Sequence, residues 1–170
     1  MGKQRPMTFW EYADRTPSLI AARDPEADSH ASELLITLNR ASGEIVRDLE
    51  GEVLKGFGLT WSGFRVLHPL WLVGALEPRE IAEVSGMSRA LVSATTKVLH
   101  KDGYVEQTGA QHDGRLVRLS LTPTGVALIS RVYREQNVRE RGWASALSQA
   151  ERAMLVELLR KLVTGPATRT

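Results

Sequence analysis

Two stretches of the sequence carry side chains suited to contact a polyanion, and the first is a helical pattern that begins after Ser88. Its outer side bears short or basic groups, which let a helix approach the base edges of a major groove and bind the flanking phosphates. Unpaired N–H groups at a helix start also favour a phosphate. The pattern therefore predicts a helix that reads double-stranded DNA. Its candidate contacts are Ser88, Arg89, Ala90, Ser93, Ala94 and Lys97.

The second stretch is "QHDGRLVRLSLTPTG", residues 111–125. The Asp113-Gly114 pair favours a tight hairpin turn, because glycine adopts a positive φ without steric cost and aspartate tolerates it. His112, Asp113 and Arg115 are then expected at the exposed tip, where they can contact an anion. Arg115 is suited to a narrow minor groove, although taken alone it also fits a solvated charged turn.

The surrounding elements predict how these candidates are positioned. Apolar side chains in 117–121 alternate with others, which is typical of a strand with one buried face, and residues 104–108 can pair with it. Upstream, Ala82 is small enough for two helices to cross closely, and Gly86 suits the turn between them. A helix-turn-helix pattern alone fits many pairs of short helices. The hairpin that follows it directly indicates a winged helix.

Apolar residues spaced by three and four, with capping residues before them, predict that the rest of the fold is helical. The fold class is therefore mainly α (α+β), a winged helix-turn-helix with a helical region beside it. In residues 1–25 we expect one or two short helices, the second starting at Thr16-Pro17, or else a partly ordered tail. Pro69 should kink or end its helix. The other expected helices span residues 28–55, 60–74, 78–86, 88–103, 123–141 and 149–163.

Composition sets limits on the class of protein. A length of 170 residues with 42% hydrophobic side chains predicts one domain with a substantial core. The absence of cysteine excludes disulfides and fits a reducing compartment. Residues 1–25 lack a secretory apolar stretch, and the run near 70–76 is too short to span a bilayer, so we expect a soluble, cytoplasmic protein without a membrane partner. The histidines lack metal-ligand spacing and no catalytic motif occurs, so no metal, cofactor or enzymatic activity is predicted.

The run "DGRLVRLSLTPTG" resembles the D-x-R-x-x-x-L-x-L-T-x-x-G signature of the MarR family of bacterial transcriptional regulators, and similar segments extend from about residue 30 to 163. This resemblance implies that Asp113 orders the wing and that Arg115 enters the minor groove. Many relatives carry basic residues mid-way along the recognition helix, where this chain has Ala94 and Val98, so their operator sequences cannot be transferred. The signature positions are Asp113, Arg115, Leu119, Leu121, Thr122 and Gly125.

The resemblance also implies a homodimer in which the first long helix and the last two helices interlock. We therefore divide the chain into an N-terminal extension (1–29), a helical dimerisation region (30–58 and 123–165) and a winged helix-turn-helix DNA-binding domain (59–122).

Family regulators commonly release DNA when a small aromatic or phenolic acid binds between the dimer helices and the winged domain. Aromatic walls with a cation suit such a ligand, although aromatic residues at helical spacing also form ordinary core. The N-terminal extension resembles that of the urate-responsive subgroup, but that subgroup's acidic residue and recognition-helix arginine correspond here to Arg65 and Thr95, so urate is not expected. The candidate ligand contacts are Trp61, Phe64, Arg65, His68 and Trp71, with Arg40, His30 and Trp10 as additions.

The sequence thus predicts a dimeric regulator that binds a pseudo-palindromic operator and most simply acts as a repressor released by the aromatic ligand. One alternative is a winged-helix protein-interaction module without specific DNA binding, and another is a dimeric scaffold. Charge favours the first reading, because residues 88–118 contain five basic and three acidic side chains, a net of +2 per protomer.

Overall fold

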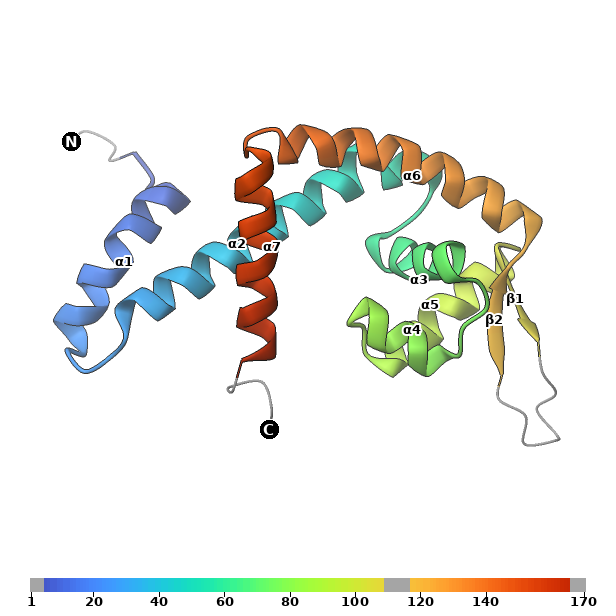
Figure 1. The fold of residues 1–170 in the computed structure, drawn as a ribbon, viewed down its shortest axis with the longest axis horizontal. Coiled ribbons are helices and arrows are strands. Elements are labelled where there is room, and N and C mark those ends of the chain that lie inside the picture. The colour runs from blue at the N-terminus through green and yellow to red at the C-terminus, as the bar shows by residue number, and fades with distance from the viewer. Residues whose placement is uncertain (1–4, 109–116, 166–170) are drawn as a thin grey trace. The chain divides into compact units, whose positions relative to one another are not determined.

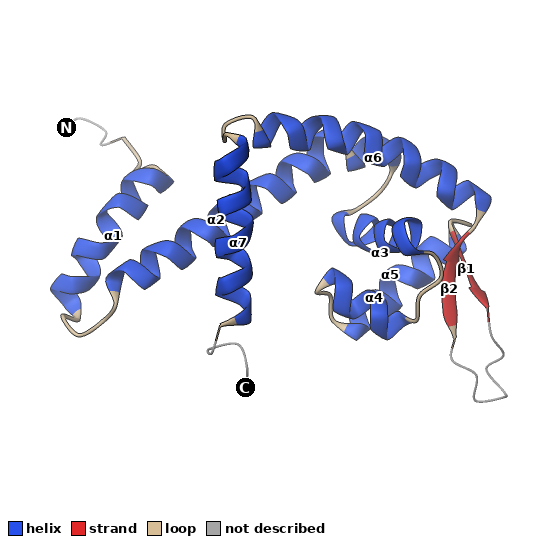
Figure 2. Ribbon diagram, viewed as in Figure 1, coloured by secondary structure: helices blue, strands red, loops and turns tan. Residues whose placement is uncertain are grey.

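The structure is a computed structural model that describes residues 5–108 and 117–165 (Figure 1). It separates into two compact units, residues 1–48 and 49–170. Figure 2 shows that helices dominate and that the described strands form one hairpin. The elements are α1 (Phe9–Arg23), α2 (Ser29–Glu52), the 3-10 helix η1 (Leu54–Phe57), α3 (Trp61–Val73), α4 (Pro78–Ser85), α5 (Arg89–Lys101), β1 (Val105–Thr108), β2 (Arg118–Leu121), α6 (Pro123–Ala144) and α7 (Gln149–Thr164).

The described part of the N-terminal extension contains one helix, α1. Thr8 caps it in a capping box with Glu11, and hydrogen bonds from Thr8 hold the pKa of the Glu11 carboxyl below its usual value. The prediction of a second helix start at Thr16 was wrong, because α1 continues through Pro17 and the Thr16 hydroxyl donates to the Tyr12 carbonyl at 2.9 Å. The helix continues after Pro17, and at its C-terminal end the N–H of Asp24 donates to the Ile20 carbonyl at 2.8 Å.

Helix α2 begins where the sequence indicates but ends earlier than expected. The carboxylate of Asp28 accepts the N–H of Ala31 at 2.9 Å. The helix stops at Glu52 rather than near Lys55, and the chain tightens into η1 before Gly58, whose φ is +67°. Burial of Val53 and Leu54 accompanies this change of helix type.

Helices α3, α4 and α5 and the β1–β2 hairpin form the winged helix (Figure 1). Leu67, Ile81 and Val92 are fully buried where the helices meet. The strands pair antiparallel, with Val105 opposite Leu121. The apolar alternation therefore positions the hairpin as the sequence predicts, with its buried face on the helices.

One feature of the sheet was not anticipated. Leu76, in the loop between α3 and α4, pairs with Leu119 of β2 through reciprocal backbone hydrogen bonds of 3.0 and 2.8 Å. This bridge adds a third partner to the hairpin and attaches it to the helix-turn-helix.

Proline does not end α3. The helix continues from Pro69 to Val73, with Gly74 as its C-cap. Because Pro69 has no N–H, the carbonyl of Arg65 loses its usual helical donor.

The last two helices begin at the predicted caps. Thr122 accepts the N–H of Gly125 at 3.0 Å, and Ser148 forms a capping box with Glu151. Hydrogen bonds from Ser148 lower the pKa of the Glu151 carboxyl. Helix α6 extends three residues beyond the expected end, and α7 one residue. No side chain of α7 is buried.

Candidate nucleic-acid interface and ligand site

The turn between α4 and α5 has the geometry that a helix-turn-helix requires. Gly86 adopts a left-handed conformation with φ of +63°, which disfavours any residue with a Cβ. Met87 is buried directly after it. Ser88 then caps α5 and accepts the N–H of Leu91 at 3.2 Å. The predicted turn and cap are both confirmed.

Helix α5 has one buried side and one exposed side. Val92, Thr96 and Leu99 face the core. The opposite side exposes short and basic groups together with the larger apolar side chains of Leu91 and Val98. All six recognition-helix candidates are exposed: Ser88, Arg89, Ala90, Ser93, Ala94 and Lys97.

Hydrogen bonds at the base of the wing attach it to the loop before α4 and join its two strands. The Arg118 guanidinium donates to the carbonyl oxygen of Ala75, which precedes the bridging Leu76. Ser120 of β2 donates to the Glu106 carboxylate of β1 at 3.2 Å. The tip candidates His112, Asp113 and Arg115 lie outside the described residues.

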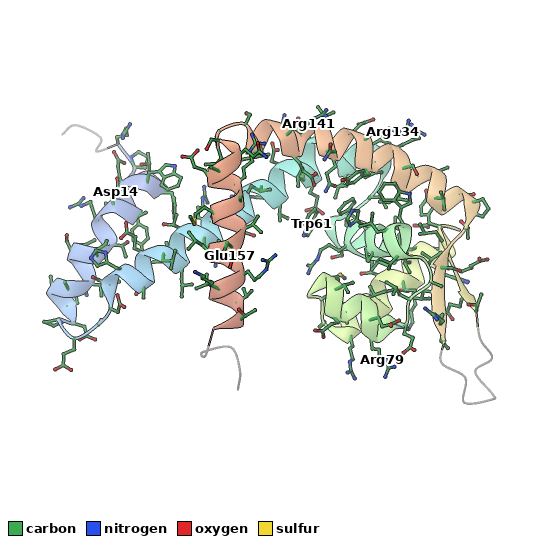
Figure 3. All side chains as sticks on the ribbon, in the orientation of Figure 1. Asp14, Trp61, Arg79, Arg134, Arg141 and Glu157 are labelled. Carbon is green, nitrogen blue, oxygen red and sulfur yellow. The ribbon has the colours of Figure 1, made fainter. Side chains whose placement is uncertain are left out.

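An aromatic cluster joins α3 to α6, and we define it as Trp61, Phe64, His68, Trp71 and Tyr133. Consecutive rings along α3 stack with centroids 5.5 and 5.1 Å apart. His68 and Trp71 both contact Tyr133, at 5.5 and 5.0 Å. Figure 3 labels Trp61 at the start of α3. The structure therefore brings the four predicted rings together.

Tyr133 was missed by the sequence analysis. It follows Val132, which with Ile129 and Gln136 marks the buried side of α6 at spacings of three and four. That periodicity was the available signal, but which helix this side faces depends on tertiary packing.

Polar groups on α6 border the aromatic cluster at His68. Burial lowers the pKa of His68, and the negative charge of Glu140 opposes this shift. The two Glu140 oxygens accept from Gln136 at 2.9 Å and Asn137 at 3.2 Å. The Gln136 side chain is 2% exposed, and its carbonyl oxygen has no hydrogen-bond partner. His68 is thus kept mainly uncharged at neutral pH.

Arg65 makes a different contact from the one expected for a ligand-binding cation. Its guanidinium donates to the carbonyl oxygen of Ser85, the last residue of α4. The residue lies on α3 between members of the aromatic cluster, but its charge is directed to the helix-turn-helix.

The remaining ligand candidates belong to the N-terminal unit. The Arg40 guanidinium pairs with Glu44 and lies 5.3 Å from the centroid of the Phe9 ring. The Nδ1 atom of His30 lies 3.4 Å from the Oε2 atom of Glu33. Trp10 is 61% exposed and packs edge-on against Phe9.

Comparison with known proteins agrees with this geometry. Residues 57–116 match the MarR family profile. The chain is 35% identical over 132 residues to the uncharacterised HTH-type transcriptional regulator YwaE of Bacillus subtilis, covering 78% of this chain and 77% of that protein. It is 31% identical over 91 residues to the transcriptional repressor MprA of Escherichia coli, covering 53% and 51%. The structure of Bordetella bronchiseptica BpsR, described as regulated in DNA binding by 6-hydroxynicotinic acid, superposes with a TM-score of 0.70 at 25% identity, over 76% of this chain and 98% of that one.

The fold and the exposed α5 define a winged helix-turn-helix DNA-binding protein. The chain belongs to the MarR family of transcriptional regulators, which are not enzymes. Within the described part of the chain, no helix is both long enough and apolar enough to cross a membrane.

Proposed function

We propose that this protein is a dimeric repressor that binds a pseudo-palindromic operator and is released by a small aromatic or phenolic acid. The proposal rests on helix α5, which is capped by Ser88 and exposes short and basic groups opposite its core, together with the apolar side chains of Leu91 and Val98. In a dimer, two such helices enter successive major grooves about one helical turn apart. The name of MprA supports repression over activation.

The dimer is supported by α7. This 16-residue helix has no buried side chain. An amphipathic helix that buries nothing within its own chain is expected to bury its apolar side against a partner. This agrees with residues 30–58 and 123–165 as the dimerisation region. The most exposed large apolar side chains of α7 are Met154, Leu155, Val156, Leu158 and Val163.

The ligand site in this proposal is the aromatic cluster. Trp61 and Trp71, which are half-buried, supply apolar ring contacts, Phe64 packs beneath them in the core, and the uncharged His68 can exchange a hydrogen bond with a phenolic hydroxyl. Regulation of BpsR by a hydroxylated aromatic acid supports the same ligand class. Because the Arg65 guanidinium is already hydrogen-bonded to Ser85, the aromatic cluster recognises the hydroxyl of the ligand rather than its carboxylate. Arg40, His30 and Trp10 stay predictions from the sequence.

The proposal is tested by fluorescence anisotropy with a duplex from upstream of the protein's own gene and a scrambled duplex, at two salt concentrations. We expect selective binding that weakens with salt, because phosphate contacts release counterions. Arg115→Ala should weaken binding while the dimer stays folded. Equal weak binding to this duplex, to other promoter fragments and to the scrambled control would instead favour the protein-interaction alternative.

Ligand release is tested in the same assay by titrating phenol, benzoate and 4-hydroxybenzoate into the protein–DNA complex. Compounds with the hydroxyl should dissociate the complex at lower concentration than benzoate. Tryptophan fluorescence should change in parallel, since Trp61 and Trp71 lie in the cluster. Release by benzoate alone would contradict recognition through the hydroxyl.

A further inference from the structure

The most unexpected contact in the winged helix is the hydrogen bond from Arg65 of α3 to the Ser85 carbonyl. We infer that Arg65 is a positioning residue for DNA recognition: it holds the turn between α4 and α5 and so sets the angle at which α5 meets the base edges. The inference rests on the proposal that α5 reads the operator, and it assigns Arg65 no contact with DNA or ligand.

The end of α4 needs such a donor. The last carbonyls of a helix have no partner within it, and a nearby cation stabilises them together with the negative end of the helix dipole. Helix α4 has only eight residues and no basic residue in its last turn. Arg65, 20 residues earlier in the chain, supplies the missing cation from a neighbouring helix.

The contact is made at the point where the chain changes direction toward α5. Ser85 is followed by Gly86 in its left-handed conformation, and a Cβ at Gly86 would lie 3.5 Å from the Arg65 guanidinium nitrogen. The Ser85 hydroxyl accepts the N–H of Met87 at 3.3 Å. Ser85 is thus held at both its carbonyl oxygen and its hydroxyl, and Ser88, three residues later, is the N-cap of α5.

This placement affects specific and non-specific DNA binding differently. Hydrogen bonds to base edges tolerate only small displacements of the recognition helix, whereas attraction to phosphates tolerates larger ones. Loss of the Arg65 contact should therefore reduce operator affinity more than affinity for unrelated DNA. A residue that itself binds a phosphate would weaken both and would lower the salt dependence.

The experiment compares Arg65→Met, Arg65→Lys and Arg134→Met in the full-length protein. Methionine keeps the apolar stem without a donor, and lysine restores a charged donor. Arg134 is exposed on α6 (Figure 3), and its replacement removes the same charge at a position far along the sequence from the turn between α4 and α5. Affinities for an operator selected with the wild-type protein and for a scrambled duplex are measured across a salt series, and circular dichroism checks folding.

We expect Arg65→Met to weaken operator binding about tenfold, with scrambled-duplex affinity and the salt slope close to wild type. Arg65→Lys should recover part of the loss, and Arg134→Met should leave the affinity ratio unchanged. Wild-type operator affinity in a folded Arg65→Met would overturn the inference. So would an equal loss on both duplexes with a salt slope reduced by about one. If Arg65→Met does not fold, Arg65→Lys decides: an operator-to-scrambled affinity ratio below that of the wild type with an unchanged salt slope supports the inference, and a wild-type ratio overturns it.

Failure of this inference differs from failure of the proposed function. If the wild-type protein does not distinguish any selected operator from scrambled DNA, the proposed function fails first. If it distinguishes them and Arg65→Met does so equally well, only the role of Arg65 is refuted.

Discussion

At the scale of single residues, Gly125 shows how one missing Cβ permits the junction between wing and helix. It lies in the first turn of α6, and a Cβ there would come within 2.0 Å of the Tyr104 carbonyl oxygen. Since the neighbour is backbone, no side-chain rotation relieves the clash. The signature glycine is therefore explained by packing as well as by the cap that Thr122 provides.

We predict that Gly125→Ala lowers the free energy of unfolding by about 3 kcal/mol, or roughly 6–12 °C in Tm for a chain of this length. The matched control is Gly142→Ala in the same helix, where a Cβ would meet nothing within 4 Å. That variant should be neutral or more stable by up to about 1 kcal/mol. Calorimetry of both proteins checks this, and equal Tm values would contradict the packing argument.

At the scale of elements, the contact between α3 and α6 combines ring packing with a titrating group. His68 has a pKa lowered by burial, so the unfolded chain binds its proton at a higher pH than the folded protein does. His68 should therefore leave the free energy of unfolding unchanged above about pH 6.5. That free energy should decrease as the pH drops from this value toward the pKa of His68 in the folded protein.

We expect His68→Phe to reduce this loss of stability, because phenylalanine keeps the ring without a titrating nitrogen. The measurement is the urea midpoint at pH 7.5 and pH 5.5, with His100→Phe at an exposed position of α5 as the control. If His68→Phe and wild type lose the same stability between these pH values, His68 does not carry the effect.

Also at the scale of elements, the helix-turn-helix is held by contacts from outside it. Arg65 reaches the end of α4, and the Leu76–Leu119 bridge attaches the wing to the loop before α4. Recognition helix and wing are therefore tied to the same short segment, residues 75–85. A rigid connection of this kind suits a reader whose helix and wing must engage adjacent grooves together.

At the scale of the whole molecule, the exposed apolar side of α7 makes the oligomeric state testable. Leu155 and Leu158 are 45% and 51% exposed in the single chain. Replacing both with glutamate should give a monomer by light scattering, since charged groups would have to be buried at the interface. The monomer should also lose most operator affinity, because one half-site supplies only part of the contacts. Glu157→Gln, between them on α7 (Figure 3), is the control. A variant that stays dimeric would place the interface elsewhere.

Much of this fold follows from local sequence chemistry. Thr60, Ser88, Thr122 and Ser148 each accept the backbone N–H three residues later, as their positions before apolar helical patterns predict. The register of the hairpin follows from a period of two, because one face must be buried. Errors occur where local signals compete, as at Thr16-Pro17, read as a new helix start, and at the end of α2.

By itself, then, the sequence determined the caps, the turn at Gly86, the exposed side of α5 and the pairing of the two wing strands, because these follow from residues a few positions apart or from the period of two along each strand. Tertiary structure alone decided that Tyr133 completes the aromatic cluster, that Leu76 joins the sheet and that Arg65 bonds to Ser85. These contacts join residues 20 to 65 positions apart in the chain. Their partners are chosen by how the helices pack, and no local pattern encodes that choice.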